Sequence, residues 1–304
     1  MSADQMSACA PWVAYSDEYL IDYPAHHVFR PEVARITLDL LLASGALTRQ
    51  NLFDPPPASW EQVSLVHRPP YLERLRRFAS QGWSETPDTP VSASILKGTL
   101  KATGGTIAAS KVALQQGRAA NLAGGYHHAF PDHGEGFCLI NDVAVALRLL
   151  QHEKLIERAA VVDLDLHQGN GTAAIFAGDP SVFTFSMHER DNYPPVKPPS
   201  DLDINLPSGT GDDYYRERLH EALPVVLAHE PQLVIYLAGV DPYRDDQLGG
   251  LALTEQGLRA RDEMVMTQVR RRGIPLCVLM AGGYASTVQE TAQLHANTVA
   301  LLAP

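Results

Sequence analysis

The chain has 304 residues, of which 45% are hydrophobic, and carries a net charge of −11 from 24 basic and 35 acidic residues, so a sizeable core is expected rather than disorder. The longest basic cluster is Arg270–Arg272, which argues against nucleic acid as a partner. The 3 cysteines lie far apart, the first residues lack the pattern of a secretory signal, and no stretch approaches the ~18 apolar residues of a membrane span, so we expect a cytoplasmic protein.

The first half of the chain predicts a tail followed by mixed helices and strands. Residues 1–10 read as a flexible tail, and residues 11–304 as a single domain without repeats or linkers. The clearest helix is 31–44, because a proline opens it, apolar residues follow at helical spacing and a glycine comes directly after it. The other elements that we expect here are strands at 12–15 and 63–66 and helices at 70–79 and 95–116.

The second half alternates regularly between strands and helices. Strand followed by helix, repeated, predicts a parallel sheet with helices on both faces, that is, one three-layer α/β/α domain with a mainly parallel central sheet. Ligands in such sheets bind beyond the carboxyl ends of the strands. The expected strands are 119–123, 160–166, 181–186, 233–238 and 275–280, and the expected helices are 141–151, 212–229, 254–271 and 287 onward.

Three polar residues end the apolar strand expected at 160–166. Strand side chains alternate between faces, so Asp163, Asp165 and His167 should project to one side. Burying unpaired carboxylates is costly, and a divalent cation is the remedy that also uses an imidazole. Asp241 follows another buried strand and would complete three ligands with a position left open, as in catalytic metal sites. We therefore predict a metal site of Asp165, His167 and Asp241.

Two further strand ends carry groups that can move or share a proton. His127 and His128 follow two glycines and titrate near neutral pH. Tyr284 follows Gly282–Gly283, and a phenol on this flexible glycine hinge could donate a hydrogen bond to a developing oxyanion; the alternative is an aromatic plug. Asp163 lies two residues before Asp165, further inside the expected strand, and is predicted to orient a histidine. A metal, a histidine base and a phenol donor together suit hydrolysis of an amide.

Six motifs in order give the chain a family resemblance. They are G-G-Y-H-H, G-E-G-F-C-L-I-N-D, D-L-D-L-H-Q-G-N-G, the strand-end Asp241, D-x-L-G-G-L and G-G-Y, spread over residues 63–284. Together they resemble the zinc-dependent histone deacetylase family. The resemblance implies the arginase/deacetylase fold, with one Zn²⁺ per chain, or Fe²⁺ or another divalent metal, on the three predicted ligands.

The resemblance also implies a role for each site residue. His128 would be the main general base, His127 its electrostatic partner or acid, and Tyr284 the group that polarises the carbonyl. The acyl-lysine channel would be lined by Gly136, Phe137, Tyr193 and Leu248. A structural K⁺ or Na⁺ would involve Asp163, Asp165, His167 and Ser186.

Two departures from the best-known members affect the details. Asn170 stands where those members have an aspartate that supports the second histidine, so this relay is neutral, and the motif looks closest to the class IV branch. The loop at 188–208 differs too, and its proline pairs predict a stiff, different rim. The preferred acyl chain, acetyl or a longer fatty acyl group, is therefore left open.

The sequence thus predicts a metal-dependent amidohydrolase that removes acyl groups from lysine side chains of proteins or peptides. The alternative with the same chemistry is an acetylpolyamine or other small-amide amidohydrolase, and the acidic charge suits cationic substrates of either kind. A binuclear manganese ureohydrolase would want more acidic ligands. A non-catalytic acyl-lysine binder would have no need of Tyr284 together with both histidines. The sequence leaves the oligomeric state undetermined.

Overall fold

An eight-stranded parallel sheet forms the centre of the computed structural model, which describes residues 11–24, 26–86 and 88–303. The expected tail at 1–10 lies outside the described residues. The strand order is β2-β1-β5-β10-β9-β6-β7-β8, and a separate antiparallel hairpin joins β3 to β4. The strands are β1 Trp12–Ala14, β2 Leu52–Phe53, β3 Trp83–Thr86, β4 Thr89–Val91, β5 Arg118–Asn121, β6 Ala159–Asp163, β7 Val182–Glu189, β8 Leu202–Leu206, β9 Leu233–Leu237 and β10 Leu276–Leu279.

Strands β6 and β9 are buried along their whole length because helices cover both faces of the sheet. In β6, Ala160 and Val162 face one apolar core, while Ala159 and Val161 face the other. This explains why these strands are almost continuously apolar instead of alternating with polar residues.

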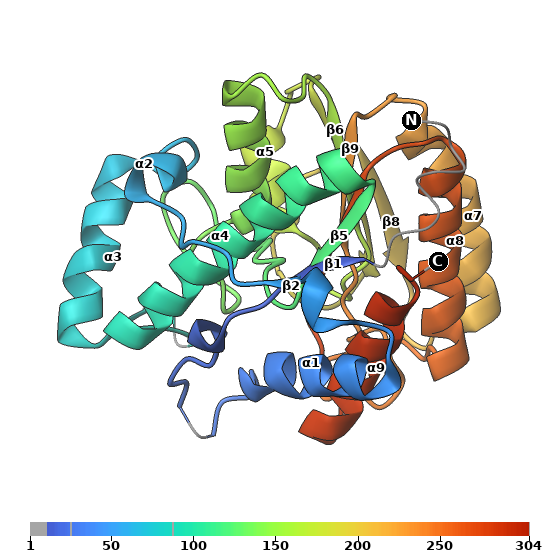
Figure 1. The fold of residues 1–304 in the computed structure, drawn as a ribbon, viewed down its shortest axis with the longest axis horizontal. Helices are drawn as coiled ribbons and strands as arrows, with labels where there is room; N and C mark the ends of the chain where they lie inside the picture. Colours follow the sequence, from blue (N-terminus) through green and yellow to red (C-terminus); the bar gives the residue numbers. More distant parts are fainter. Residues whose placement is uncertain (1–10, 25, 87, 304) are drawn as a thin grey trace.

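The helices form the two outer layers. Helices α2 to α6 contribute to the core that contains Val161, and α1 and α7 to α9 contribute to the opposite core. Figure 1 shows α1 against α9, and α7 beside α8. The predicted three-layer α/β/α fold is thereby confirmed. The helices are α1 Glu32–Ser44, α2 Trp60–Val63, α3 Pro69–Gln81, α4 Ala93–Gln116, α5 Asp142–His152, α6 Asn170–Phe176, α7 Asp212–Leu227, α8 Glu255–Arg271 and α9 Val288–Ala300, with short 3₁₀ turns at Asp17–Tyr19 and Arg49–Asn51.

The expected strand at 63–66 is wrong. The helix α2 ends there instead. It begins at a capping box, in which the Ser59 hydroxyl accepts from the backbone nitrogen of Gln62 and the side-chain oxygen of Gln62 accepts from the backbone nitrogen of Ser59. The S-x-x-Q spacing is the local signal for this start, and it outweighs the β-branched residues that follow. Helix α6, strands β2 and β8 and the hairpin of β3 and β4 were not expected.

None of the helices in the described part of the chain is long and apolar enough to cross a membrane. Cys138 and Cys277 are buried and unpaired with another cysteine. Cys9 belongs to the segment outside the described residues.

Candidate metal centre and active site

Asp165, His167 and Asp241 meet beyond the carboxyl ends of β6 and β9. One ligand atom from each lies within 4.8 Å of the others, and all three side chains are buried. The Nδ1 atom of His167 is 3.1 Å from Oδ1 of Asp165 and 3.2 Å from Oδ2 of Asp241. The structure therefore brings the three predicted metal ligands together.

The reason for their convergence differs from the expected strand alternation. Strand β6 ends at Asp163, so Asp165 and His167 lie in the loop that follows. There the carboxylate of Asp163 accepts from the backbone nitrogen of Asp165 at 3.2 Å, and the carboxylate of Asp165 accepts from that of His167 at 2.9 Å. Each aspartate side chain closes a short turn, and these two successive turns position the side chains of Asp165 and His167 at the site.

A buried arginine that we did not expect holds the two strand ends together. Arg261 on α8 donates from Nη1 to the carbonyl oxygen of Gly239 at 2.6 Å and to that of Leu164 at 3.3 Å, and its side chain is 0% exposed. Asp262 accepts from its Nε at 2.8 Å and balances the charge. The sequence signal was the charged pair on the otherwise apolar face of the helix, where Leu258 also lies.

Position 282 must be a glycine because the carboxylates of Asp165 and Asp241 come too close to leave room for a side chain. A Cβ atom at this position would lie 2.3 Å from Oδ2 of Asp241 and 2.6 Å from Oδ2 of Asp165. Its backbone nitrogen donates to that Asp165 oxygen at 2.8 Å, while the backbone nitrogen of Tyr284 donates to Asp246 at 2.6 Å. Hydrogen bonds therefore hold this segment against the predicted metal ligands, and close approach accounts for the glycine at this position, while the expected flexible hinge stays a prediction.

A divalent metal fits the donor atoms of Asp165, His167 and Asp241. Burial and the neighbouring charge of Asp165 raise the pKa of Asp241 to about 8, as expected for two carboxylates held together away from water. A cation between them would relieve that repulsion, and imidazole with two carboxylates is a ligand set that zinc and related divalent metals accept. The carboxylate of Asp163 is hydrogen-bonded to His127, and that of Asp246 accepts from the backbone nitrogens of Leu248 and Tyr284, so both already have partners other than the second metal of a ureohydrolase.

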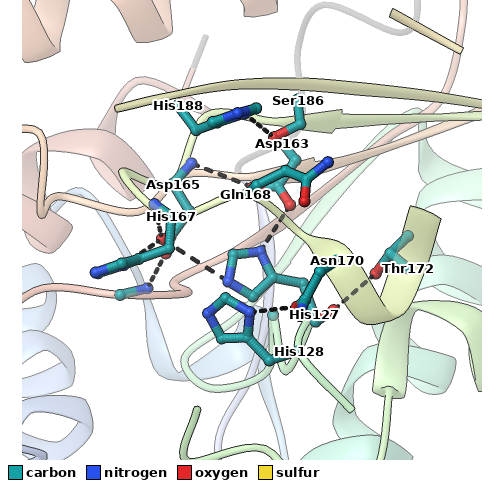
Figure 2. Close-up of polar contacts among 12 residues, drawn as sticks. His127, His128, Asp163, Asp165, His167, Gln168, Asn170, Thr172, Ser186 and His188 are labelled. Atoms are coloured by element: carbon teal, nitrogen blue, oxygen red, sulfur yellow. Dashed lines mark hydrogen bonds and ion pairs between the residues drawn. The ribbon is translucent and has the colours of Figure 1, made fainter. Parts of the chain in front are cut away.

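The rings of His127 and His128 lie side by side next to this centre, with centroids 4.1 Å apart (Figure 2). His127 Nδ1 is 2.7 Å from a carboxylate oxygen of Asp163, and His128 Nδ1 is 2.7 Å from the amide oxygen of Asn170. Both acceptors are oxygens without a hydrogen, so both Nδ1 atoms donate.

The different partners move the two pKa values apart. Burial lowers the pKa of His127, but the charges of Asp163 and Asp165 outweigh it and raise the pKa to about 9. Burial, together with the positive charges of His127 and His167, lowers the pKa of His128 well below its ordinary value. At neutral pH His127 is therefore cationic and His128 neutral, an arrangement that assigns an acid and a base to neighbouring groups.

The loop that carries these histidines is anchored by two residues that we had not singled out. The Asp142 carboxylate accepts from the backbone nitrogens of Tyr126 at 2.7 Å and Gly125 at 3.1 Å. The Asn141 amide caps α5 and donates to the carbonyl oxygen of Ala129 at 3.2 Å. Their signal was present as the N-D pair that ends G-E-G-F-C-L-I-N-D.

A cavity of about 290 Å³ leads to the histidines, and Asp165 and His167 also line it. The ring of Tyr193 stands nearly perpendicular to that of His128 at 5.0 Å, and the ring of Phe137 to that of Tyr284 at 5.9 Å. Burial, then the charges of Asp165 and Asp241, raise the pKa of Tyr284 well above its ordinary value and keep its hydroxyl protonated. Gly136 and Leu248 also line this cavity, as does Asp88, which the sequence did not suggest.

Ser186, the remaining predicted site residue, pairs with Asp163 across β6 and β7. Its hydroxyl is 2.9 Å from Nδ1 of His188, which in turn is bonded through Nε2 to Asn205 at 3.0 Å. The structure thus places Ser186 beside the inner aspartate, and a monovalent cation at this point stays a prediction.

The fold and the site define a three-layer α/β/α protein that has a candidate metal centre and two adjacent histidines beyond the carboxyl ends of its central strands. The chain belongs to the histone deacetylase family, since the histone deacetylase domain matches residues 27–301. It is thus an enzyme of a hydrolase family that acts on acyl amides. The predicted likeness to the class IV branch stays a prediction.

Individual relatives are similar over nearly the whole chain. Histone deacetylase 2 of Arabidopsis thaliana is 31% identical, with 94% of this chain and 77% of that protein covered. An uncharacterized protein of Picosynechococcus is 41% identical, with 93% and 95% covered. Among solved structures, the HD domain of HDA15 has a TM-score of 0.82 at 24% identity, covering 96% of this chain and 90% of that one, which supports the fold alone.

Proposed function

We propose that this chain is a metal-dependent lysine deacylase, which hydrolyses the amide between an acyl group and a lysine side chain of a protein or peptide. The observation that carries the proposal is the adjacent pair of His127 and His128, with pKa values shifted in opposite directions, beside the cluster of Asp165, His167 and Asp241. A non-catalytic binder would have no use for such a pair.

The neutral ring of His128 is suited to be the base. Its Nδ1 hydrogen is donated to Asn170, so the lone pair on Nε2 is free to take a proton from the attacking water. A divalent metal held by Asp165, His167 and Asp241 would supply Lewis acidity that polarises the amide carbonyl and makes water more acidic. The lowered pKa keeps this base unprotonated at neutral pH.

His127 and Tyr284 are suited to stabilise the charge that develops. His127 is cationic at neutral pH, so it stabilises a tetrahedral oxyanion electrostatically and is available as an acid for the departing amine. The protonated phenol of Tyr284 lines the same cavity and donates a hydrogen bond to that oxyanion. The proton removed from water and the proton given to the leaving nitrogen balance the hydrolysis.

The walls of the cavity favour an extended aliphatic side chain as substrate. Phe137 and Tyr193 contribute aromatic rings, and Gly136 leaves space between the Tyr193 and His128 rings. Apolar and aromatic walls suit the methylene chain of lysine, whose acylated nitrogen carries no charge.

A substrate panel tests the proposal. Purified, metal-loaded protein is assayed with lysine peptides that carry acyl groups from acetyl to myristoyl and, in parallel, with acetylated polyamines, with His128→Ala as the inactive control. We expect release of carboxylate from the peptides at a kcat/KM at least about tenfold above that for the polyamines. The reverse preference would instead establish the small-amide amidohydrolase, and turnover of neither class would refute an acyl-amide hydrolase altogether.

A further inference from the structure

A second carboxylate stands behind the histidine that we propose as the base. The Asn170 side chain donates from Nδ2 to Oε1 of Glu135 and accepts at Oδ1 from Nδ1 of His128 (Figure 2 shows the second contact). Asn170 is 1% exposed, so its amide depends on protein partners. The Glu135 side chain is 22% exposed and belongs to the loop that also carries Gly136 and Phe137.

The contact with Glu135 decides which way the Asn170 amide faces. The two ends of a carboxamide have nearly the same shape, so packing alone selects weakly between them. A carboxylate can only accept, and it therefore requires the NH₂ end. A flipped amide would set its carbonyl oxygen against the carboxylate and lose the hydrogen bond.

The direction of the amide in turn decides which nitrogen of His128 carries the hydrogen. With the carbonyl oxygen of Asn170 facing the ring, Nδ1 must be protonated and Nε2 keeps its lone pair for the reaction. With the NH₂ group facing the ring, Nδ1 would have to accept, and the hydrogen would move to Nε2, where the proton should be taken up. A base in that second tautomer is blocked.

We propose that Glu135 is a positioning residue that sets the tautomer of His128 through the Asn170 amide. The inference rests on the proposed function only in that it takes His128 as the base. The matched case within the same site is His127, which contacts the carboxylate of Asp163 directly and carries a positive charge. An amide between carboxylate and ring transmits the orientation while the charge of Glu135 stays one side chain further away.

The same carboxylate also acts on one wall of the channel. Burial and then the charge of Glu135 raise the pKa of the Tyr193 hydroxyl, and the Tyr193 ring packs nearly perpendicular to that of His128. His133, the other neighbour, has its Nε2 3.7 Å from Oε2 of Glu135, so it does not compete for the oxygen that Asn170 uses. Loss of Glu135 should therefore disturb both the base and the wall beside it.

The experiment is nitrogen NMR of the histidine rings in protein labelled with ¹⁵N-histidine and loaded with its divalent metal, with the His128 signals assigned by their loss in His128→Gln. In the wild type we expect Nδ1 protonated and Nε2 unprotonated. Glu135→Lys presents only donors, so the Asn170 amide should flip and the Nε2–H tautomer should dominate. Glu135→Gln has nearly the same shape and offers both an acceptor and a donor, so it should populate both tautomers even if the lysine variant fails to fold.

Kinetics and a matched control complete the test. Asp132→Asn removes the same charge from the same loop, but Asp132 contacts Arg68 and His133 instead of Asn170, so the tautomer and kcat should stay as in the wild type. For Glu135→Lys we expect kcat to fall by about 10²-fold, the contribution of one general base, with a smaller change in KM. An unchanged His128 tautomer in both Glu135 variants would overturn the inference. A tautomer that changes as expected, in a protein that hydrolyses no acyl amide, would leave the inference standing and refute the proposed function.

Discussion

Replacing Asn170 by aspartate should shift the pH dependence of the enzyme, because it sets a negative charge against the proposed base. Asn170 Oδ1 is 2.7 Å from Nδ1 of His128, the same separation as between Asp163 and His127. Both rings are buried, yet the pKa of His127 is raised to about 9 and that of His128 is lowered. The two histidines thus compare, within one protein, a carboxylate partner and an amide partner at the same distance from the ring.

The expected magnitude follows from Coulomb's law. Two unit charges with centres about 4 Å apart interact by about 4 kcal/mol at an effective dielectric constant of about 20, equivalent to roughly 3 pKa units. Glu135 faces the same side chain and opposes a second negative charge there, which reduces the effect. We therefore expect Asn170→Asp to raise the pKa of His128 by about 1 to 3 units.

The sign follows from the role of the base. His128 must be neutral to accept a proton, so a higher pKa means that more alkaline conditions are needed to deprotonate it. The acidic limb of kcat/KM against pH should move to higher pH by the same 1 to 3 units that the pKa gains, as measured for wild type and variant with the best acyl-lysine peptide. Metal content and circular dichroism serve as controls. An acidic limb that stays in place or moves to lower pH, in a variant with full metal occupancy, would show that Asn170 does not support the general base.

Three other substitutions test the metal centre, the oxyanion donor and the channel. Asp241→Ala should lose both the metal and the activity, because two ligands hold a catalytic metal poorly; a full metal equivalent by elemental analysis would contradict the ligand assignment. Tyr284→Phe should keep the metal but lower kcat by about 10² to 10³, the loss typical of one oxyanion donor, and an unchanged kcat would make the ring a plug. Gly136→Ala puts a Cβ atom 2.5 Å from Cδ2 of His128 at a residue with φ of 53°. It should lower the free energy of unfolding by about 1 to 2 kcal/mol in a denaturant titration and reduce kcat/KM, whereas wild-type values for both would show that the channel wall has more room than we infer.

The sequence predicted the architecture, and it predicted which three residues meet at the candidate metal centre, because both leave local signals. Buried parallel strands such as β9 are short, apolar runs, and the helices between them carry caps and apolar stripes that one window of sequence reveals. Asp165 and His167 were recognisable because polar residues at the end of such a strand are unusual, and the motif order led to the histone deacetylase family, which the matches confirm.

Some elements were missed or assigned wrongly. Strand β8 is only five residues long, with apolar and polar residues in alternation, and it lies at the edge of the sheet, where it pairs with β7. The segment at 63–66 has β-branched residues, but the capping box at Ser59 and Gln62 starts a helix just before it. The strand is defined by its pairing with a neighbouring strand, whereas the helix is started by a local cap that outweighs the preference of the residues after it.

Only the tertiary structure decided how the site residues are held. Arg261 reaches the carbonyl oxygens of two different strand ends, and Gly282 matters because two ligand carboxylates lie where its side chain would be. The contact of Glu135 with Asn170 joins residues 35 positions apart, and that of Asn170 with His128 joins residues 42 positions apart. Residue types and spacing predict a base and a metal ligand. The partner of each hydrogen bond, and with it the protonation state of each histidine, depends on side chains that are brought together only when the separate strands pair and their carboxyl ends meet.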